Sequence, residues 1–346
     1  MNIFVYLIIG ILIFLLIFML ITFLIYNKIF SKRYEMADKP MSISLSLYDF
    51  PNLRATPVSF HTTDSLLKGN FYHSSTVSIT QKCLLIFCHG ISNGSRDYLT
   101  QINYFVQQGF EVLAYDNTGT HNSSGKGIRG LPQSLINLHD VLNLLSTQDE
   151  FKPYWKLPLI LIGHSWGAFA VNAVLNYREF KNIKAVVSFS AFNRPIDMLV
   201  QQGKHLFGNA IFLFRPFLQF IEFIRFNKVS HFTSIGGVNS CDIPILAIHS
   251  KDDPIVYFEN SLVSKKLQCT NPNAVFITLD GCKHNVTLSQ NARNYGAELK
   301  ASIKIPKHIN SQDEIEKYLI NIDKMRLYEL DMHRMKFIEN FIVKAL

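Results

Sequence analysis

The stretch "LPLILIGHSWGAFAVNAVLNY", residues 157–177, decides the fold. It begins with a run of apolar residues, passes through GHSWG at 163–167 and continues as an Ala-rich amphipathic run. This pattern predicts a buried strand that turns directly into a helix. A serine at such a tight turn projects its hydroxyl out of the backbone. Glycine two residues before and two residues after it removes Cβ atoms that would crowd the turn.

The same alternation of short apolar runs and helical patterns continues through most of the chain. Apolar residues recur at helical spacing in 98–108, 132–147 and 168–177. Continuous apolar runs predict strands at 82–89, 110–116, 157–163, 183–190, 243–249 and 274–279, and alternating runs predict a hairpin at 55–61 and 67–73. Strands that alternate with helices predict an α/β fold with a mostly parallel sheet and helices on both faces.

A long segment at 194–240 interrupts this rhythm because it contains no convincing strand pattern. It includes the apolar run LFGNAIFLFRPFLQFIEFI, which carries Arg215, Pro216 and Glu222. Charge and proline are unfavourable at the centre of a membrane helix. We therefore expect a helical cap insertion here, with a second membrane span as the alternative.

The C-terminal part of the chain adds a polar segment before its last helix. We expect residues from about 286 to 325 to form an extra insertion, with a capping-box pattern at Ser311 and Glu314. An amphipathic pattern at 324–345 predicts one final helix that packs back on the sheet.

The N-terminus carries a different signal, because residues 3–26 contain no charged residue. As a helix they reach roughly 36 Å, enough to cross a hydrocarbon core of about 30 Å. A cleaved signal peptide and a buried core helix are the alternatives. The segment has no basic start and is longer than a signal-peptide core. We expect a transmembrane anchor at 1–27, a linker at 28–50 and one large α/β domain at 51–346.

The residues that flank the anchor bear on its orientation. Lys28, Lys32 and Arg33 follow it directly, and such basic residues favour the cytoplasmic side. The five cysteines form no CxxC pair, which is typical of reduced thiols. We therefore expect a single-pass membrane protein whose domain lies on the cytoplasmic face.

Composition argues against several other functions. The net charge is +8, but Lys and Arg are scattered without a basic stripe, so no nucleic acid partner is expected. The twelve histidines show no HExxH pattern, and no Walker loop or GxGxxG follows a first strand. The sequence therefore predicts neither a metal site nor a cofactor.

Chemistry-bearing residues follow several of the predicted strands. A serine hydroxyl is a poor nucleophile unless a base accepts its proton, and the base needs an acid to orient it. Asp252 and Asp253 come just after one strand, and His284 comes just after the last. All lie at the carboxyl edge of the predicted sheet with Ser165. Their chain order, Ser, Asp, His, is typical of a serine at this kind of turn.

The region from about residue 52 to 346 resembles the α/β-hydrolase superfamily. It is most similar to bacterial membrane-anchored members related to the Bem46-like and S33 serine-aminopeptidase-like groups. The motifs that carry the resemblance are CHGI at 88–91, DNTG at 116–119 with Ser123 beyond it, GHSWG at 163–167, HSKDDP at 249–254 and GCKH at 281–284. One such motif is weak evidence, whereas five in the right order and strand context are strong evidence.

The resemblance implies a catalytic triad. It assigns Ser165 as the nucleophile, His284 as the base and Asp253 as the orienting acid. Asp253 is preferred because Pro254-Ile255-Val256 follows it, as an x-hydrophobic-Val sequence follows the family acid. Asp252 remains the alternative acid.

The resemblance also implies an oxyanion hole made of the backbone amides of Ile91 and Trp166. Other histidines lie near these motifs. We expect His164 to pack beside the turn and His89 to support the oxyanion loop. His249 is the alternative base.

The expected substrate depends on the cap. Phe207, Phe214 and Phe217 are expected to line an apolar pocket, which favours a lipid or lipophilic ester. An aminopeptidase would need acids in the cap, where only Asp197 and Glu222 occur. The sequence thus favours a membrane-anchored serine esterase. A serine peptidase, an acyltransferase on the same triad and a non-catalytic membrane-tethered binding protein are the alternatives.

Overall fold

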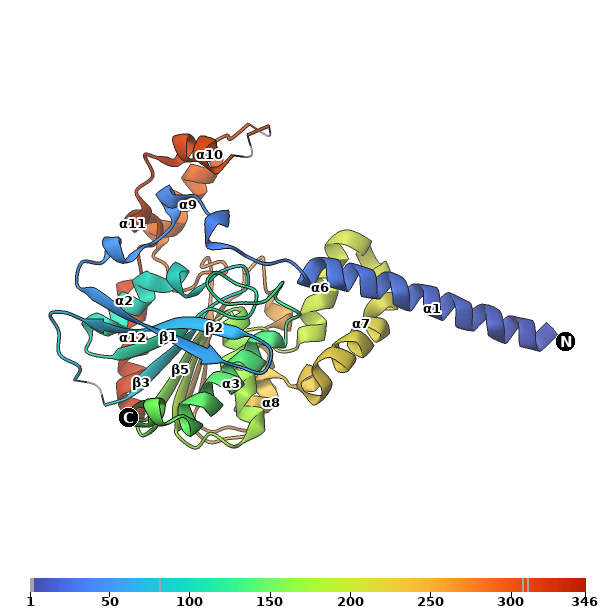
Figure 1. The fold of residues 1–346 in the computed structure, drawn as a ribbon, viewed down its shortest axis with the longest axis horizontal. Helices are drawn as coiled ribbons and strands as arrows, with labels where there is room; N and C mark the ends of the chain where they lie inside the picture. Colours follow the sequence, from blue (N-terminus) through green and yellow to red (C-terminus); the bar gives the residue numbers. More distant parts are fainter. Residues whose placement is uncertain (1–2, 81, 307, 310) are drawn as a thin grey trace.

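The core of the protein is an eight-stranded sheet with the order β1-β2-β4-β3-β5-β6-β7-β8 (Figure 1). The computed structural model describes residues 3–80, 82–306, 308–309 and 311–346. The strands are β1 Leu53–His61, β2 Leu66–Ser74, β3 Leu84–Cys88, β4 Glu111–Tyr115, β5 Leu159–His164, β6 Ile183–Phe189, β7 Ile245–Ser250 and β8 Ala274–Leu279. β2 pairs antiparallel with β1 and β4, and all other pairs are parallel. The predicted strands and the mostly parallel sheet are confirmed.

Helices cover both faces of this sheet, which explains the continuous apolar runs in its central strands. In β3, Leu84 and Ile86 belong to the core on one face, with the side chains of α3 (Gln133–Thr147) and α5 (Trp166–Ala173). Leu85 belongs to the opposite core, with α2 (Leu99–Gln107) and α12 (Met332–Ala345). A strand covered on both faces must be apolar at every position.

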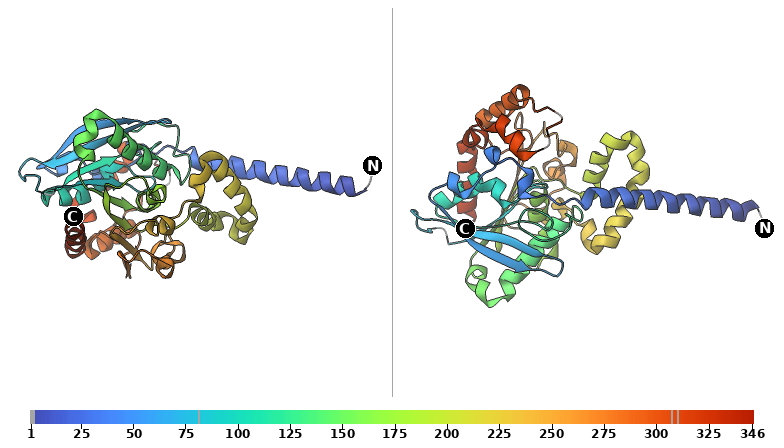
Figure 2. Two further views of the ribbon diagram at one scale, coloured as in Figure 1. Left: turned by 90° about the horizontal axis from the view of Figure 1, so that it is seen from below. Right: turned by 45° about the horizontal axis from the view of Figure 1, so that its top comes forward.

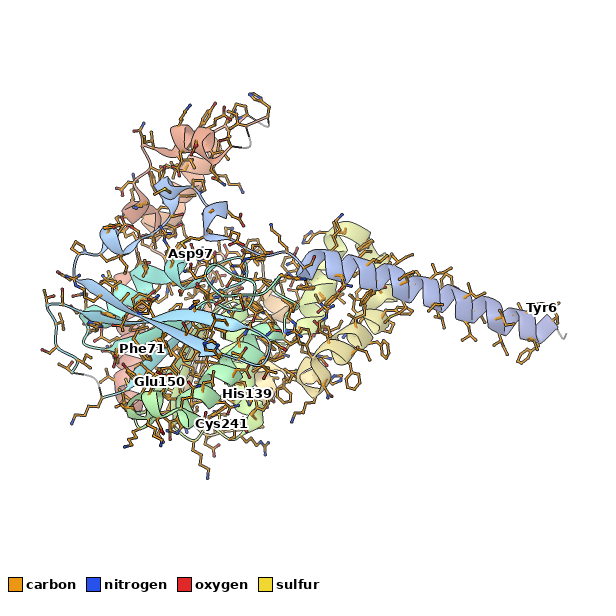
Figure 3. All side chains as sticks on the ribbon, in the orientation of Figure 1. Tyr6, Phe71, Asp97, His139, Glu150 and Cys241 are labelled. Carbon is orange, nitrogen blue, oxygen red and sulfur yellow. The ribbon has the colours of Figure 1, made fainter. Side chains whose placement is uncertain are left out.

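The N-terminal helix projects away from the domain. α1 (Ile3–Phe30) extends past the expected boundary at residue 27, and its N-terminal end lies far from the sheet (Figures 1 and 2). Its side chains stand clear of the domain along most of its length, and only Thr22, Tyr26 and Phe30 are buried (Figure 3). Its length and apolar composition suit a membrane anchor or a signal sequence.

The expected linker after α1 is packed against the domain. Tyr34 donates its backbone N–H to the carbonyl of Gly119 at 3.0 Å. Leu45 and Phe50 are buried in the core with α2 and α12. The segment between α1 and β1 thus ties the helix to the sheet and is not a free tether.

The cap segment is helical and contains no strand among its described residues. It comprises α6 (Pro195–Phe207), α7 (Ile211–Phe226) and α8 (Ser234–Val238). Positive φ angles at Gly208 and Asn227 end α6 and α7, so this apolar segment is not one continuous helix. α6 and α7 lie beside the domain end of α1 in each view (Figures 1 and 2).

The polar insertion near the C-terminus lies on another side of the domain, against the segment that follows α1 (Figure 1). It contains α9 (Gln290–Ser302), α10 (Gln312–Leu319) and α11 (Lys324–Leu327); the remaining short helix, α4 (Lys152–Trp155), precedes β5. The expected capping box of α10 is wrong: Ser311 is the N-cap residue, but its side chain makes no capping hydrogen bond.

The expectation of one final helix at 324–345 is also wrong, because the chain is extended between α11 and α12. The backbone N–H of Asp331 donates to Thr287 at 2.9 Å, and that of Ser289 donates to Glu329 at 2.9 Å. These bonds remove the intervening residues from helical geometry. The Asp331 side chain then caps α12 by accepting from the backbone N–H of Arg334 at 2.9 Å.

The cap of α12 gives a stability test. Replacing Asp331→Ala removes the acceptor and should destabilise the protein by about 1 kcal/mol. This corresponds to a fall in Tm of about 2–4 °C, measured on the detergent-solubilised full chain. Asp331→Asn retains a capping oxygen, so its Tm should fall by less. An equal fall in Tm in both variants would contradict the capping role.

Candidate active site

The serine at 165 lies in a strained turn between β5 and α5. Ser165 has φ +55° and ψ −110°, a conformation that L residues rarely adopt and that costs on the order of 1–3 kcal/mol. A Cβ on Gly163 would lie 2.4 Å from the carbonyl oxygen of Gly167, and a Cβ on Gly167 would lie 2.1 Å from that of Cys88. Glycine is therefore required at both positions, and the serine side chain is raised above the sheet edge.

An acid and a histidine meet on the loops after β7 and β8. Nδ1 of His284 lies 2.7 Å from Oδ2 of Asp253, whose side chain is fully buried. Oδ1 of Asp253 accepts from the backbone N–H groups of Ile255 and Val256 at 2.8 and 3.1 Å. Burial alone would raise the pKa of Asp253, but the His284 contact and the two backbone donors hold that pKa below its usual value. The carboxylate is thus ionised and fixed.

The neighbouring acid, Asp252, faces Ser250 and Lys283 and not His284. Asp252 accepts from the Ser250 hydroxyl and from the backbone N–H of Lys283, and forms an ion pair with the Lys283 ammonium at 3.1 Å. Partial burial would raise the pKa of Asp252, but these bonds lower it to about 2. Of the two candidate acids, Asp253 is the one hydrogen-bonded to His284.

The His284 loop lies beside Ser165, although no hydrogen bond joins the Ser165 hydroxyl to His284 in the part of the chain that the structure describes. The carbonyl of His284 accepts from Ser190 Oγ at 2.6 Å and from His164 Nε2 at 3.2 Å. The rings of His164 and His284 lie 4.7 Å apart, centroid to centroid. Contacts between nucleophile and base are often loose without substrate and tighten when it binds.

Two backbone amides suit an oxyanion. Trp166 is the first residue of α5, so its N–H is one of the unpaired donors at a helix N-terminus. Ile91 follows Gly90, and a Cβ built on Gly90 would lie 3.5 Å from that of Ser165. Among the described residues, neither the Ile91 nor the Trp166 amide has an acceptor.

Buried polar contacts hold the loop after β3 that contains Gly90 and Ile91, which we call the β3 loop. Nε2 of His89 accepts from the backbone N–H of Asn117 at 2.9 Å, so its Nδ1 carries the proton and donates to the carbonyl of Gly90 at 2.7 Å. Asp116 accepts from the backbone N–H of Ser95 at 2.7 Å. Both side chains position loops around the serine.

A hydrogen-bond chain links the β3 loop to the His284 loop. The Tyr98 hydroxyl accepts from the backbone N–H of Gly90 at 3.0 Å and donates to Nδ1 of His164 at 2.7 Å, and Nε2 of His164 donates to the carbonyl of His284. Burial and the neighbouring His284 lower the pKa of His164 to about 3, so this ring is neutral and acts as a spacer. The sequence offered no signal for Tyr98, which appeared only as the start of a helix.

The alternative base is buried below the acid. Nε2 of His249 donates to the carbonyl of Val256 at 2.9 Å and lies 3.6 Å from Oδ2 of Asp253. Burial lowers the pKa of His249. The Nε2 proton of His249 is therefore already donated to the Val256 carbonyl, beside the Asp253 carboxylate.

A cavity of about 320 Å³ opens above Ser165, Ile91 and Trp166. As expected, Phe207 and Phe214 line it. The expectation for Phe217 is wrong, because this ring is not part of the lining and instead packs 5.5 Å from Phe18 of α1. An unexpected part of the lining comes from α1, namely Thr22, Ile25, Tyr26, Ile29 and Phe30.

Comparisons with known proteins bear on the fold that carries this site. The family model described as serine aminopeptidase, S33, matches residues 80–233. An esterase of Pyrococcus furiosus has a similar structure, with a TM-score of 0.52 and 18% identity over 80% of this chain and 95% of the esterase. The acylaminoacyl peptidase of Pyrococcus horikoshii has a TM-score of 0.50 and 15% identity over 69% of this chain and 38% of that protein. No curated protein matches the sequence. The likeness shows the α/β-hydrolase fold and confirms the resemblance to that superfamily.

The hydrogen-bond chain gives a test of positioning. Tyr98→Phe leaves two buried groups, the Gly90 amide and His164 Nδ1, without a partner, which should cost about 1–3 kcal/mol. Because both loops beside Ser165 lose a restraint, the rate of fluorophosphonate labelling at Ser165 should also fall.

Tyr104→Phe is the matched control on α2, the helix that begins directly after Tyr98. The Tyr104 hydroxyl donates to Glu339 at 2.7 Å, away from the serine. The substitution should lower Tm without slowing the labelling. Equal labelling rates in the two variants would show that the Tyr98 bond contributes only to stability.

Proposed function

We propose that the protein is a membrane-anchored serine hydrolase that cleaves the carboxylic ester of a lipid or lipophilic molecule through an acyl-enzyme on Ser165. The observation that carries this proposal is the position of Ser165, which lies at its strained turn on the wall of an apolar cavity. The hydrogen-bonded Asp253–His284 pair beside it supports the assignment of base and acid.

The geometry supports two-step acyl transfer. Ser165 Oγ attacks the ester carbonyl while His284 accepts its proton, and Asp253 holds the ring and stabilises the imidazolium. The amides of Ile91 and Trp166 stabilise the oxyanion, and each such donor contributes about 3 kcal/mol in the transition state. His284 then protonates the leaving alcohol. In the second step His284 accepts a proton from water, whose oxygen attacks the acyl carbonyl. His284 then returns the proton to Ser165 Oγ as the bond to the acyl group breaks and the carboxylic acid leaves.

The cavity favours an ester over a peptide. Among the described residues no carboxylate lines it, so no side chain there offers a counter-charge to a substrate ammonium. Both acids of the cap are engaged: Asp197 pairs with Arg215 at 3.1 Å, and Glu222 accepts from Tyr26 at 3.0 Å. The family model and the peptidase neighbour favour the alternative of a serine aminopeptidase or peptidase. Transfer of the acyl group to an acceptor other than water would use the same acyl-enzyme.

The proposed location is the cytoplasmic face of a membrane. α1 is exposed and apolar over most of its length, which is unfavourable in water. Lys28, Lys32 and Arg33 follow the apolar segment and suit the cytoplasmic interface. All five cysteines are free thiols, as is usual in a reducing compartment.

Covalent labelling tests the nucleophile. A fluorophosphonate should label the full-length protein in detergent, and Ser165→Ala should abolish the label because the attacking hydroxyl is gone. Folded wild-type protein that remains unlabelled would refute the hydrolase and favour the binding-protein alternative.

The same preparation distinguishes the substrate classes. Wild type should hydrolyse p-nitrophenyl esters, with kcat/KM rising with acyl chain length, and should leave aminoacyl-p-nitroanilides largely intact. Faster turnover of the nitroanilides than of the esters would contradict the esterase proposal and favour the peptidase alternative.

The two aspartates provide a matched pair. Asp253→Asn should lower kcat for a p-nitrophenyl ester by about 10³–10⁴-fold, because the ring loses the carboxylate that orients it and stabilises its charge. Asp252→Asn removes the partly exposed ion pair with Lys283, while its amide oxygen can still accept from Ser250 and the Lys283 backbone, so kcat should change by less than about fivefold. The reverse ranking would make Asp252 the functional acid.

A further inference from the structure

The cavity above Ser165 is not a property of the hydrolase domain alone. Thr22, Ile25, Tyr26 and Ile29 of α1 lie at helical spacing along one face of the helix, and all four line the cavity. The opposite wall comes from α6 and α7 of the cap. The N-terminal helix thus forms one side of the chamber that contains the serine.

Polar contacts fix the rotation of α1 against the cap. The Tyr26 hydroxyl donates to Oε1 of Glu222 at 3.0 Å, and both residues are buried. Arg225 donates to Oδ1 of Asn27 at 2.6 Å and stacks over the Tyr26 ring at 5.0 Å. Separating α1 from α7 would leave these buried groups unpaired, which is unfavourable. The same face of α1 is therefore held toward the cavity.

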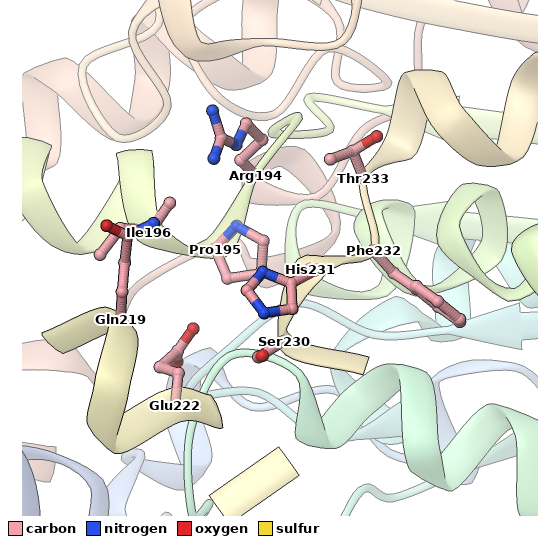
Figure 4. Close-up of a pocket in the computed structure, with 9 residues that line it drawn as sticks. All are labelled: Arg194, Pro195, Ile196, Gln219, Glu222, Ser230, His231, Phe232 and Thr233. Atoms are coloured by element: carbon pink, nitrogen blue, oxygen red, sulfur yellow. The ribbon is translucent and has the colours of Figure 1, made fainter. Parts of the chain in front are cut away.

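A second small cavity lies behind this contact. Figure 4 shows this cavity, which Glu222 of α7 lines together with Arg194 and His231 of the cap. The space is only about 20 Å³, room for about one water molecule. It is too small to admit a lipid, so the larger cavity is the one that can receive substrate.

The length of α1 places the larger cavity at the membrane surface. About 20 residues at 1.5 Å each are needed to cross a hydrocarbon core of about 30 Å. The uncharged run of α1, residues 3–26, has at least this length, and Thr22, Ile25 and Tyr26 of the cavity lining lie at its C-terminal end. The cavity therefore begins where the hydrocarbon core is expected to end.

The outer face of the cap continues the apolar surface of α1. The exposed apolar side chains of the cap are Leu206, Phe212, Leu213, Phe220, Phe223 and Ile224. Together with residues 3–24 of α1 we call them the anchor–cap surface. Phe18 joins the two parts, since its ring lies 4.5 Å from that of Phe214. Lys28 and Lys204 lie at its borders, where they suit anionic lipid headgroups.

We propose that the anchor–cap surface rests in the bilayer and that the cavity takes its substrate directly from the leaflet, as a membrane-resident lipid ester whose acyl chain enters between α1 and the cap helices. This inference rests on the proposed serine hydrolase function. The chain moves from one apolar environment to another, so its methylene groups are never exposed to water. The ester group then meets Ser165 at the inner end.

A pair of substitutions on adjacent residues of α1 tests the shared wall. Ile25 lines the cavity, whereas Leu24 is 57% exposed and lies outside the lining. In the full-length protein in phosphatidylcholine–phosphatidylglycerol vesicles, Ile25→Trp should lower kcat/KM for p-nitrophenyl dodecanoate at least about tenfold, because the ring fills space needed by the chain. It should leave p-nitrophenyl butyrate nearly unchanged. Leu24→Trp should preserve both activities.

Identical chain-length profiles for the two variants would overturn the inference. Fluorophosphonate labelling of each variant verifies a folded site, and labelling with an unchanged profile would leave the proposed function intact. Should Ile25→Trp fail to fold, Ile25→Ala is the second variant. It enlarges the cavity at the same wall and should shift the substrate preference to longer acyl chains. An unshifted preference in that variant would equally refute the shared wall. Wild type that neither labels nor cleaves esters would instead refute the hydrolase itself.

Entry from the leaflet has its own readout. At a fixed total amount of dodecanoate ester, extra vesicle lipid dilutes the ester within the bilayer. The rate should therefore fall with its surface mole fraction, whereas hydrolysis of the water-soluble butyrate should not. A dodecanoate rate that followed the bulk concentration would show that substrate enters from water.

Discussion

The close approach of the turn after β5 to the end of β3 is the constraint on which the site depends. The backbone at Gly167 lies against the carbonyls of Cys88 and His89, where even one methyl group would collide. This contact packs the start of α5 onto the sheet edge and holds Ser165 in an unfavourable conformation. The surrounding parallel strands supply the restraint, because Ser165 donates its own amide to Phe189 on β6. Strain at one residue persists only where its neighbours determine its position.

The loops around this turn share a common support. The β3 loop, the turn at Ser165 and the His284 loop come from distant parts of the chain, and hydrogen bonds through Tyr98 and His164 join them. A buried, neutral His164 can accept on one ring nitrogen and donate on the other, so it connects two loops without introducing a charge. The cap and α1 then complete the chamber from outside the sheet. In the proposed enzyme, the sheet edge would carry the chemistry, and the cap with α1 would control substrate access.

Much of the fold follows from patterns within short segments. A strand buried on both faces must be apolar throughout, so the central strands were recognisable, and the glycines around Ser165 marked the turn. Prediction was poorer where long-range contacts decide the structure. The break between α11 and α12 arises from pairing of Asp331 with Thr287, which no helical periodicity reveals. Phe217 lies on an apolar cap helix, as expected, but its orientation toward α1 depends on how the two helices pack.

By itself, the sequence determined the order of strands and helices, the strained serine turn and the presence of an acid and a histidine at the same sheet edge. These depend on local rules of backbone geometry and on the alternation of apolar residues. Only the tertiary structure decided that Asp253 faces His284 while Asp252 faces Lys283, since adjacent side chains differ only in direction. It also decided that α1 forms a wall of the cavity. Hydrophobicity is non-directional, so an apolar helix shows that it avoids water but not whether lipid or protein covers each face.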